Sequence, residues 1–415
     1  MKILQVMSGQ LMSGAGRGAL ALHRGLKSMA VESRLLGRLE RNLPNGITGT
    51  RFCEWQWLKT GLSNRLYLGR LRRQFGQPEA LFHPVSHGFA PHQHPLFDWA
   101  DLVHVQWSHA ATLGPDFWRK LPTTRRPVIF TLRDMWLFTG GCHFSGPCTE
   151  YERSCTECAM LGGANDITGR DLAFKRSTVP HAAAFVAISE QIAAEARRSA
   201  VLRNAEIRVI PNSVDTGAFA AIDKRQARQQ LGLPLDAFII GVGALNLSER
   251  RKGAAVMQKV MADLGDTPGL HWAVFGADPF PVPANSTWFG RVDDDARLNL
   301  ILSAADLFVM PSLQESFGKT TAEALAAGTP VLAFDKTPAR EIVQHDKSGW
   351  IVPHGDAASM GAGILRAARM ERAARIDMGQ AGRRHVLSTY APEVVAKAHV
   401  ALYAEMLERH RGLVC

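Results

Sequence analysis

The chain is organised around Pro311-Ser-Leu-Gln-Glu315-Ser-Phe-Gly-Lys319-Thr-Thr-Ala-Glu323-Ala-Leu-Ala-Ala-Gly-Thr-Pro330. An apolar segment of strand length precedes it at 306–310, and another follows at 331–334. Between them, residues 319–327 are rich in good helix formers, and Gly328 with Pro330 forms a helix stop. The pattern predicts a strand, a loop, a short helix and a second strand, which together make a βαβ unit of a parallel sheet.

The loop over 312–318 is a candidate ligand site, because parallel sheets bind ligands where their strands end. Its last three residues would offer backbone N–H groups to a phosphate at the start of the helix: Ser316, Phe317 and Gly318. Glu315 in the loop can accept hydrogen bonds from sugar hydroxyls, and Glu323 in the helix can reach a ribose. A loop acid plus a solvated helix face is the plainer interpretation of these two acids, so only their neighbours make them informative.

With 415 residues, the chain is long enough for two domains that each bury a hydrophobic core. Apolar residues make up 46% and charged residues 21%, which is ordinary for a soluble globular protein. No apolar run approaches the roughly 18 residues of a transmembrane helix. The apolar start over 1–7 is too short for a signal peptide and is typical of a first strand. We therefore expect a cytoplasmic protein.

The net charge of +10 favours an anionic partner, which is a nucleic acid, a membrane surface or a small substrate. Residues 59–75 carry five basic side chains and no acid, interspersed with leucines. This composition suits a helix that lies on anionic lipid at the inner face of the plasma membrane. An ordinary exposed helix with a core-facing stripe fits equally well. Nucleic acid is the least favoured partner, because zinc-finger spacing, an RNP motif and a convincing helix-turn-helix are missing.

Two glycines follow the expected first strand, Gly14 and Gly16, at the start of a helix expected to reach about residue 29. Glycines spaced so closely let a backbone approach a ligand, although a plain tight turn has the same composition. Further along, Arg250, Arg251 and Lys252 precede Gly253 and an apolar helix. Such a basic triplet either solvates a surface or forms a cationic site at the same sheet edge as Glu315.

These motifs together resemble those of the retaining sugar-nucleotide glycosyltransferases of family 4. The strongest match is Pro-Ser-x-x-Glu-x-Phe-Gly-x-x-x-x-Glu-Ala-x-Ala-x-Gly-x-Pro-Val over 311–331. The resemblance implies the GT-B fold, an α/β architecture of two Rossmann-like, doubly wound domains facing a cleft. Residues 208–215 resemble the family's hinge, with Ser213 in place of glycine. We therefore expect domains over 1–213 and 214–391, and a final helix over 392–413 that returns to the first.

The resemblance also implies roles for these residues. Lys252, with Arg251 or Arg250, would hold the donor diphosphate; Glu315 would orient the sugar and Glu323 the ribose. The remaining donor-binding candidates are the glycine loop and the residues that open the helix: Gly14, Gly16, Ser316, Phe317, Gly318 and Lys319. No catalytic metal or other cofactor is needed, because lysine and the helix dipole can stabilise the leaving phosphate.

A departure from the family pattern occurs at Arg133. The block over 131–143 resembles the colanic-acid-type bacterial enzymes, in which a histidine near the donor sugar usually occupies this position. Arginine cannot act as a general base near neutral pH, but it can hold a phosphate or an acceptor charge. We therefore keep Arg133 as a catalytic candidate, with His104 or His143 as partial substitutes for the missing histidine.

Four cysteines cluster after this block, at Cys142, Cys148, Cys155 and Cys158. In a cytoplasmic chain, thiols grouped with glycines and a proline suggest a structural zinc site. Four free thiols or a redox pair remain the alternative, because the spacing is not that of a standard finger. A catalytic metal is not expected, since four thiolates leave no open position for a substrate.

The predicted function is that of a retaining hexosyltransferase. It would move a sugar from a nucleoside-diphosphate sugar to a saccharide acceptor, expected to be lipid-linked, in exopolysaccharide, capsule or lipopolysaccharide assembly. One alternative is a sugar-nucleotide epimerase with the same fold. The other, which Arg133 raises, is a protein that binds a sugar nucleotide or a membrane partner with little or no catalysis.

Overall fold

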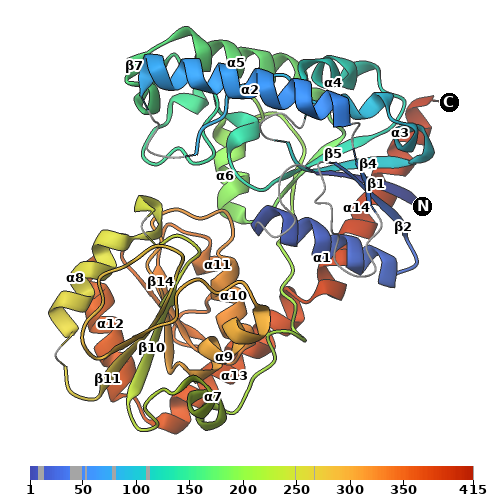
Figure 1. The fold of residues 1–415 in the computed structure, drawn as a ribbon. Coiled ribbons are helices and arrows are strands. Elements are labelled where there is room, and N and C mark those ends of the chain that lie inside the picture. Colours follow the sequence, from blue (N-terminus) through green and yellow to red (C-terminus); the bar gives the residue numbers. More distant parts are fainter. Residues whose placement is uncertain are drawn as a thin grey trace. The chain divides into compact units, whose positions relative to one another are not determined.

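The computed structural model describes residues 1–7, 14–37, 49–51, 54–76, 81–108, 113–247, 249–265 and 267–414. The chain forms two compact units (Figure 1). The first unit comprises Met1–Pro211 and Val395–Cys415, and the second comprises Asn212–Val394. Each unit contains a sheet whose strand pairs are all parallel, so the predicted α/β class is confirmed.

The sheet of the first unit has the strand order β3-β2-β1-β4-β5-β8-β9. Its strands are β1 (Lys2–Met7), β2 (Glu32–Gly37), β3 (Gly49–Arg51), β4 (Leu102–Trp107), β5 (Val128–Leu132), β8 (Ala184–Ala187) and β9 (Ile207–Val209). The helices are α1 (Gly14–Ser28), α2 (Glu54–Phe75), α3 (Pro95–Trp99), α4 (Pro115–Lys120), α5 (Asp166–Thr178), α6 (Glu190–Arg198) and α14 (Pro392–Val414). A short antiparallel hairpin joins β6 (Glu157–Cys158) to β7 (Gly163–Ala164).

The central strands of this sheet are buried on both faces. On β1, Ile3 packs with Leu22 of α1 and Tyr403 of α14, whereas Leu4 belongs to the core on the opposite face. That opposite core is rich in aromatic rings and includes Trp118 of α4. Successive side chains of a strand point to opposite faces, so a strand covered by helices on both sides is mostly apolar. This explains why β1 is buried from Ile3 to Met7, with Gln5 as the polar residue among them.

The sheet of the second unit has the order β12-β11-β10-β13-β14-β15. Its strands are β10 (Phe238–Gly243), β11 (Leu270–Phe275), β12 (Ser286–Trp288), β13 (Leu307–Met310), β14 (Val331–Phe334) and β15 (Gly349–Val352). The helices are α7 (Lys224–Leu231), α8 (Ala254–Leu264), α9 (Asp295–Ala304), α10 (Lys319–Ala326), α11 (Ala339–Ile342), α12 (Ala357–Arg369) and α13 (Arg372–Thr389). Within the described ranges of the chain, no helix is long and apolar enough to cross a membrane.

The βαβ unit expected around residues 306–334 is confirmed. Strands β13 and β14 are parallel neighbours, and α10 connects them. The helix ends as predicted, because Gly328 adopts a left-handed conformation with φ of 82°. Gly379 of α13 packs against this turn so closely that a Cβ there would overlap the carbonyl oxygen of Gly328. The local signal and the tertiary packing therefore specify the same helix end.

Candidate functional site

The loop between β13 and α10 is fixed in place at its α10 end. Gly318 precedes α10 in a left-handed conformation, with φ of 85°, which glycine adopts without steric cost. Phe317 is buried, and its ring meets that of Tyr390 edge-on with centroids 5.7 Å apart. Ser316 is buried as well. The backbone turn at the start of α10 is therefore anchored by an apolar side chain.

A cationic turn lies against this loop. Lys252 Nζ is 2.5 Å from Glu315 Oε1, and Arg251 Nη1 is 3.8 Å from Glu315 Oε2. Ser312 Oγ donates a hydrogen bond to Glu315 Oε1 at 3.0 Å. The side chains of Lys252 and Glu315 are 17% and 12% exposed, so the pair is largely withdrawn from bulk water. Three of the predicted site residues are thus brought together, across 63 positions of sequence.

The electrostatics of Glu315 follow from this arrangement. Burial by itself raises the pKa of a carboxyl group, but Lys252, Arg251 and the hydrogen bond from Ser312 outweigh it. The net pKa of Glu315 therefore lies below its ordinary value. The carboxylate stays ionised at neutral pH, which makes it an acceptor for hydroxyl donors and a counterion for Lys252.

The backbone fixes the cationic turn to the loop. Arg250–Lys252 form one turn of 3-10 helix, and Gly253 follows with φ of 76°. A Cβ at Gly253 would overlap the carbonyl oxygen of Pro311, so only glycine allows this approach. The Arg251 carbonyl also accepts a hydrogen bond from Leu313 N at 2.7 Å. The positions of the basic side chains are therefore set by main-chain contacts.

The other predicted donor-binding residues occupy two places. On α10, Lys319 Nζ lies 3.2 Å from Glu323 Oε1, and the Glu323 side chain is only 4% exposed. Arg250 is exposed at the start of the cationic turn. Gly14 and Gly16 belong to the first unit, where they form the first turn of α1; Gly14 is exposed and Gly16 is buried. The segment 8–13, which precedes these glycines, lies outside the described residues.

Arg133 is buried where β5 ends in the first unit. Its Nε donates to the Gln106 carbonyl at 2.9 Å, and its Nη2 donates to Gln106 Oε1 at 2.6 Å. Burial lowers the pKa of Arg133 to about 10, which still leaves the side chain charged at neutral pH. His104, one of the two histidines considered as substitutes, lies within the core and binds Tyr403 OH at 2.6 Å. Its place in the core argues against a substitute role.

The second histidine, His143, belongs to a chain of polar side chains. Asp134 Oδ2 is 2.7 Å from His143 Nδ1 and accepts from Trp107 Nε1 at 2.8 Å. His143 Nε2 is 2.9 Å from His83 Nδ1. Burial alone raises the pKa of Asp134, but His143 and the other donors lower it to about 2. Burial and the neighbouring His143 lower the pKa of His83 to about 4.

The predicted structural zinc site is not supported. The four cysteines are described and free, and no group of three histidine, cysteine or acidic side chains in the described ranges could hold a metal ion. The four cysteines come from different turns: Cys148 precedes the turn at Glu150–Glu152, and Cys158 lies in the β6–β7 hairpin. Burial raises the pKa of Cys142, and the nearby thiols of Cys155 and Cys158 add to the rise, so the cysteines are neighbours in the fold although the described residues form no group that could hold a metal ion.

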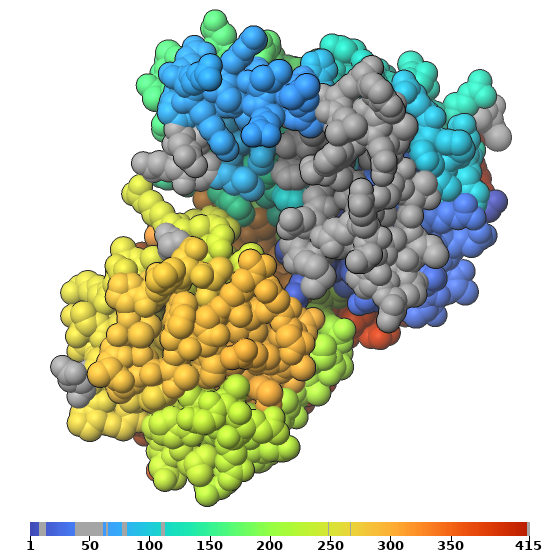
Figure 2. Space-filling model, in the orientation of Figure 1, coloured from blue at the N-terminus to red at the C-terminus, as the bar shows by residue number. Residues whose placement is uncertain are grey.

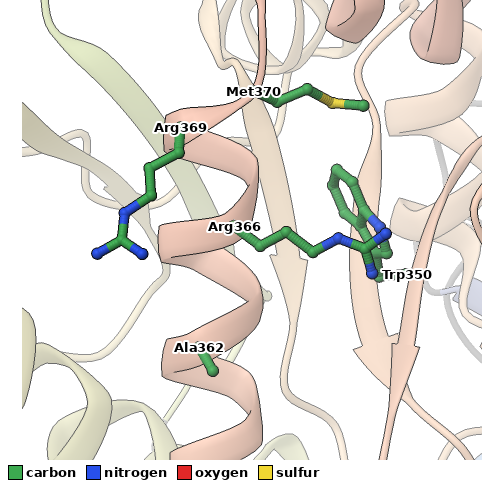
Figure 3. A pocket seen from close by; sticks show the side chains of 5 residues that line it. All are labelled: Trp350, Ala362, Arg366, Arg369 and Met370. Carbon is green, nitrogen blue, oxygen red and sulfur yellow. The ribbon is translucent and has the colours of Figure 1, made fainter.

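A hollow of about 410 Å³ lies elsewhere on the second unit (Figure 3). It is lined by Trp350, Ala362, Arg366, Arg369 and Met370. The Arg366 guanidinium lies 5.4 Å from the Trp350 ring centroid, whereas Arg369 points away from that ring. Trp350 pairs with Leu332 in the first half of β14, so the hollow is separate from the loop after β13. None of the predicted site residues contributes to it.

Sequence reasoning missed several residues that shape these sites. Ser312 and Pro311 were inside the quoted motif, but only the fold reveals that they contact Glu315 and Gly253. Asp134 is next to Arg133 in the sequence, but no sequence pattern indicated its hydrogen-bond partners. His83 had no signal, because it lies in a stretch without periodicity, 60 positions before His143.

Comparison with known proteins identifies the family. Residues 12–218 match the family model described as glycosyltransferase family 4, and residues 223–385 match that of glycosyl transferases group 1. One curated relative is an Escherichia coli protein described, provisionally, as the colanic acid biosynthesis glycosyl transferase WcaC. It is 28% identical over 232 residues, which cover 54% of this chain and 55% of the relative. The chain thus spans about half the length of the curated relatives it matches.

Solved structures share the fold over nearly the full chain. Sucrose-phosphate synthase from Thermosynechococcus elongatus superposes with a TM-score of 0.68 at 18% identity, covering 99% of this chain and 100% of that one. The Anabaena protein HepE, in complex with UDP and glucose, superposes with a TM-score of 0.63 at 16% identity. The superposition covers 97% of this chain and 99% of HepE. At such identities the likeness shows the fold alone. With both family matches and this fold, the chain belongs to the family 4 glycosyltransferases of the GT-B type.

Proposed function

We propose that the protein transfers a sugar from a nucleoside-diphosphate sugar to a saccharide acceptor. The observation that carries this proposal is the cluster of Lys252, Arg251 and Glu315 at the loop after β13. It combines paired cations, suited to a diphosphate, with an ionised carboxylate, suited to sugar hydroxyls. The complex of the structural neighbour HepE with UDP and glucose makes uridine the first nucleotide to test.

In the proposed reaction, the diphosphate leaves the anomeric carbon and the acceptor oxygen bonds to the same face, with retention. Charge develops on the leaving phosphate, and Lys252, Arg251 and the amides at the start of α10 would stabilise it. Without ligand, Lys252 is paired with Glu315, so donor binding would exchange part of this ion pair for a phosphate contact. Glu315 would then be available to the sugar. The leaving phosphate would take the proton of the acceptor hydroxyl.

The acceptor is proposed to be a lipid-linked saccharide of bacterial polysaccharide assembly. The named role of the Escherichia coli relative in colanic acid biosynthesis supports this pathway class. The surface of α2, light blue in Figure 2, supports contact with a membrane. Leu62 and Leu66 are 63% and 62% exposed there, with Arg65, Arg70 and Arg73 exposed beside them. Exposed leucines among arginines suit the interface of an anionic bilayer.

Thermal shift measurements with nucleoside diphosphates and sugar nucleotides of uridine, guanosine and adenosine test the donor site. A ligand at one hundred times its Kd stabilises a protein by about 2.7 kcal/mol, which raises the melting temperature by several degrees. We expect one nucleotide to give this shift with the native protein. Lys252→Met should abolish it. Lys259→Met is the matched control, because Lys259 is 65% exposed and forms its ion pair with Asp263 on the same helix, α8.

Activity and stereochemistry need two further measurements. Release of the nucleoside diphosphate from the bound sugar nucleotide, and NMR assignment of the anomeric configuration in the product, test transfer with retention. Binding of a sugar nucleotide without turnover would favour a non-catalytic binding protein, and a sugar altered while still attached to the nucleotide would favour an epimerase. No thermal shift with any nucleotide would overturn the proposed donor site.

Co-sedimentation with vesicles tests the membrane contact separately. The native protein should bind vesicles that contain phosphatidylglycerol more tightly than neutral phosphatidylcholine vesicles. Leu62→Gln combined with Leu66→Gln should weaken that binding. If the double variant binds as well as the native protein, the exposed face of α2 is not the contact.

A further inference from the structure

The hollow on the second unit lies at the edge of its sheet. Strand β15 is the last in the order β12-β11-β10-β13-β14-β15, and Trp350 of this strand lines the hollow together with side chains of α12 and of Met370. The volume of about 410 Å³ is in the range of sites that bind small molecules. None of the lining residues belongs to the cluster of Lys252 and Glu315. The hollow is therefore a candidate for a second ligand.

Trp350 brings a buried hydrogen-bond donor to this hollow. The residue is 2% exposed, and its indole Nε1 has no hydrogen-bond partner among the described residues. An indole nitrogen can only donate, and a buried donor without an acceptor costs free energy in the folded state. The guanidinium of Arg366, 5.4 Å from the centroid of the same ring, is also a donor (Figure 3). An anion beside these two groups would accept hydrogen bonds from both.

Arg366 is held at the hollow by Asp346. The Arg366 Nη2 atom donates to Asp346 Oδ1 at 2.8 Å, and Asp346 N donates to the carbonyl of Gly349, the residue before Trp350, at 2.8 Å. This ion pair uses one nitrogen of the guanidinium. The other two, Nε and Nη1, have no acceptor within the part of the chain that the structure describes. The guanidinium therefore has donors left for a ligand.

The arginines of the hollow are not needed to complete the end of α12. The carbonyls at this end accept from α13, where Arg375 Nη1 donates to Ala367 O, at 3.3 Å, and to Met370 O. Arg369, one turn after Arg366, is exposed and forms no ion pair within the described ranges. Its charge adds to that of Arg366, so the potential at the hollow favours a negatively charged ligand.

We propose that this hollow binds the phosphate group of a phosphorylated ligand. Arg366 and Trp350 Nε1 donate to the phosphate oxygens, Arg369 supplies a second positive charge, and Asp346 positions Arg366. A phosphate fits better than a carboxylate, because its oxygens point in several directions and can accept from donors on β15 and α12 at once. A carboxylate has two oxygens in one plane. The site is separate from the proposed donor site and does not rest on the proposed function.

The indole N–H of Trp350 can report on the ligand directly by NMR. In protein that carries nitrogen-15 in its nine tryptophans, the indole signal that is missing from Trp350→Phe belongs to Trp350. Titration with inorganic phosphate, and separately with glucose 1-phosphate, should move this signal downfield until it saturates, because the proton gains an acceptor. Acetate at the same ionic strength is the carboxylate control and should give a weaker response.

Three substitutions separate the hollow from general positive charge and from the donor site. Arg366→Gln should raise the half-saturating phosphate concentration about tenfold, the effect of losing one charge-assisted hydrogen bond. Its side chain is 60% exposed, so the variant should fold. Arg372→Gln is the matched control, because Arg372 is an exposed arginine at the start of α13 that does not line the hollow. It should change half-saturation by no more than about twofold, since salt screens exposed charges. Lys252→Met should leave the Trp350 response unchanged.

The proposal is overturned if neither phosphate gives a saturable shift of the Trp350 signal. Equal half-saturation of Arg366→Gln and the native protein, a tighter response to acetate, or loss of the response in Lys252→Met would also reject it. Vesicles that contain phosphatidylglycerol identify the source of the phosphate. If Arg366→Gln weakens co-sedimentation and Arg372→Gln does not, the ligand is a lipid headgroup; if Arg366→Gln loses the phosphate response but co-sediments as the native protein does, the ligand is a soluble molecule.

Discussion

The two sheets of the molecule carry polar groups at the same kind of edge, but they stabilise them differently. In the second unit, Lys252 and Glu315 form a compact ion pair, fixed by the backbone of Gly253. In the first unit, Asp134 is buried among neutral hydrogen-bond donors and is paired with a histidine. Paired charges that can be exchanged suit a charged diphosphate, whereas oriented neutral groups suit a sugar ring. The difference between the two edges predicts a difference between their ligands.

The largest expected effect comes from Gly253→Ala. This substitution would disrupt the sheet edge that carries Lys252 and Glu315, which we call the donor edge. The new methyl group must adopt a left-handed backbone and displace the Pro311 carbonyl, at a combined cost of about 2–5 kcal/mol. Nucleotide thermal shifts should disappear together with the fall in melting temperature. Gly232→Ala is the matched control: Gly232 has φ of 66° but open space around its Cβ position, so only about 1 kcal/mol is expected.

Lys175→Met should reveal a desolvated charge in the first unit. Burial lowers the pKa of Lys175 to about 8, below the ordinary value of 10.5. Between these pH values the unfolded chain binds more protons than the folded one, so this group makes folding more favourable as pH rises. The native protein should therefore gain about 2–3 kcal/mol relative to the variant between pH 8 and 10.5. Chemical denaturation at several pH values measures the free energy of unfolding of both proteins. If the difference between native protein and variant stayed constant over this pH range, the expectation would be contradicted.

Asp134→Asn should show a pH dependence of the same sign in the acid range. The pKa of Asp134 in the folded protein, about 2, lies below its ordinary value of 3.8. Its contribution to stability is therefore present above pH 4 and is lost as pH falls toward 2, amounting to about 2 kcal/mol. Acid unfolding followed by circular dichroism should show a gap between native protein and variant at pH 5 that narrows at lower pH. Nucleotide shifts should remain in the variant, because Asp134 belongs to the first unit and the cluster of Lys252 and Glu315 to the second.

The smallest effect is expected for Lys319→Met. Lys319 pairs with Glu323 one helical turn away; an exposed pair of this kind contributes about 0.3–0.5 kcal/mol, and because the Glu323 side chain is only 4% exposed, we expect a loss nearer ~1 kcal/mol. The melting temperature should fall by only a few degrees. Titration calorimetry with the bound nucleotide then shows whether this lysine contacts the donor: a severalfold loss of affinity assigns it to the donor edge, and unchanged affinity assigns it to the helix alone. Either result shows whether the donor edge extends to Lys319 on α10.

Local sequence signals were sufficient for the elements around the donor edge. The pattern of residues 306–334 predicted the ends of β13, α10 and β14 to within one residue. This was possible because the apolar runs, the helix formers and the Gly328 stop lie within, or directly beside, the elements that they specify. The membership of Lys252 and Glu315 in one site came from family resemblance rather than from spacing. Their contact itself depends on the packing of Gly253 on Pro311, which has no signal in either segment alone.

The sequence by itself determined the α/β class, the parallel sheets and the family, because periodicity and motif order are properties of the chain. Tertiary structure alone decided which side chains meet. It gave the four cysteines, which lie within 17 residues of each other, an arrangement that does not form a metal-holding group among the described residues. It also joined His83 to His143 across 60 residues. The sequence specifies the chemistry of each side chain. Which side chains come together in space depends on long-range packing, and no local sequence pattern records that packing.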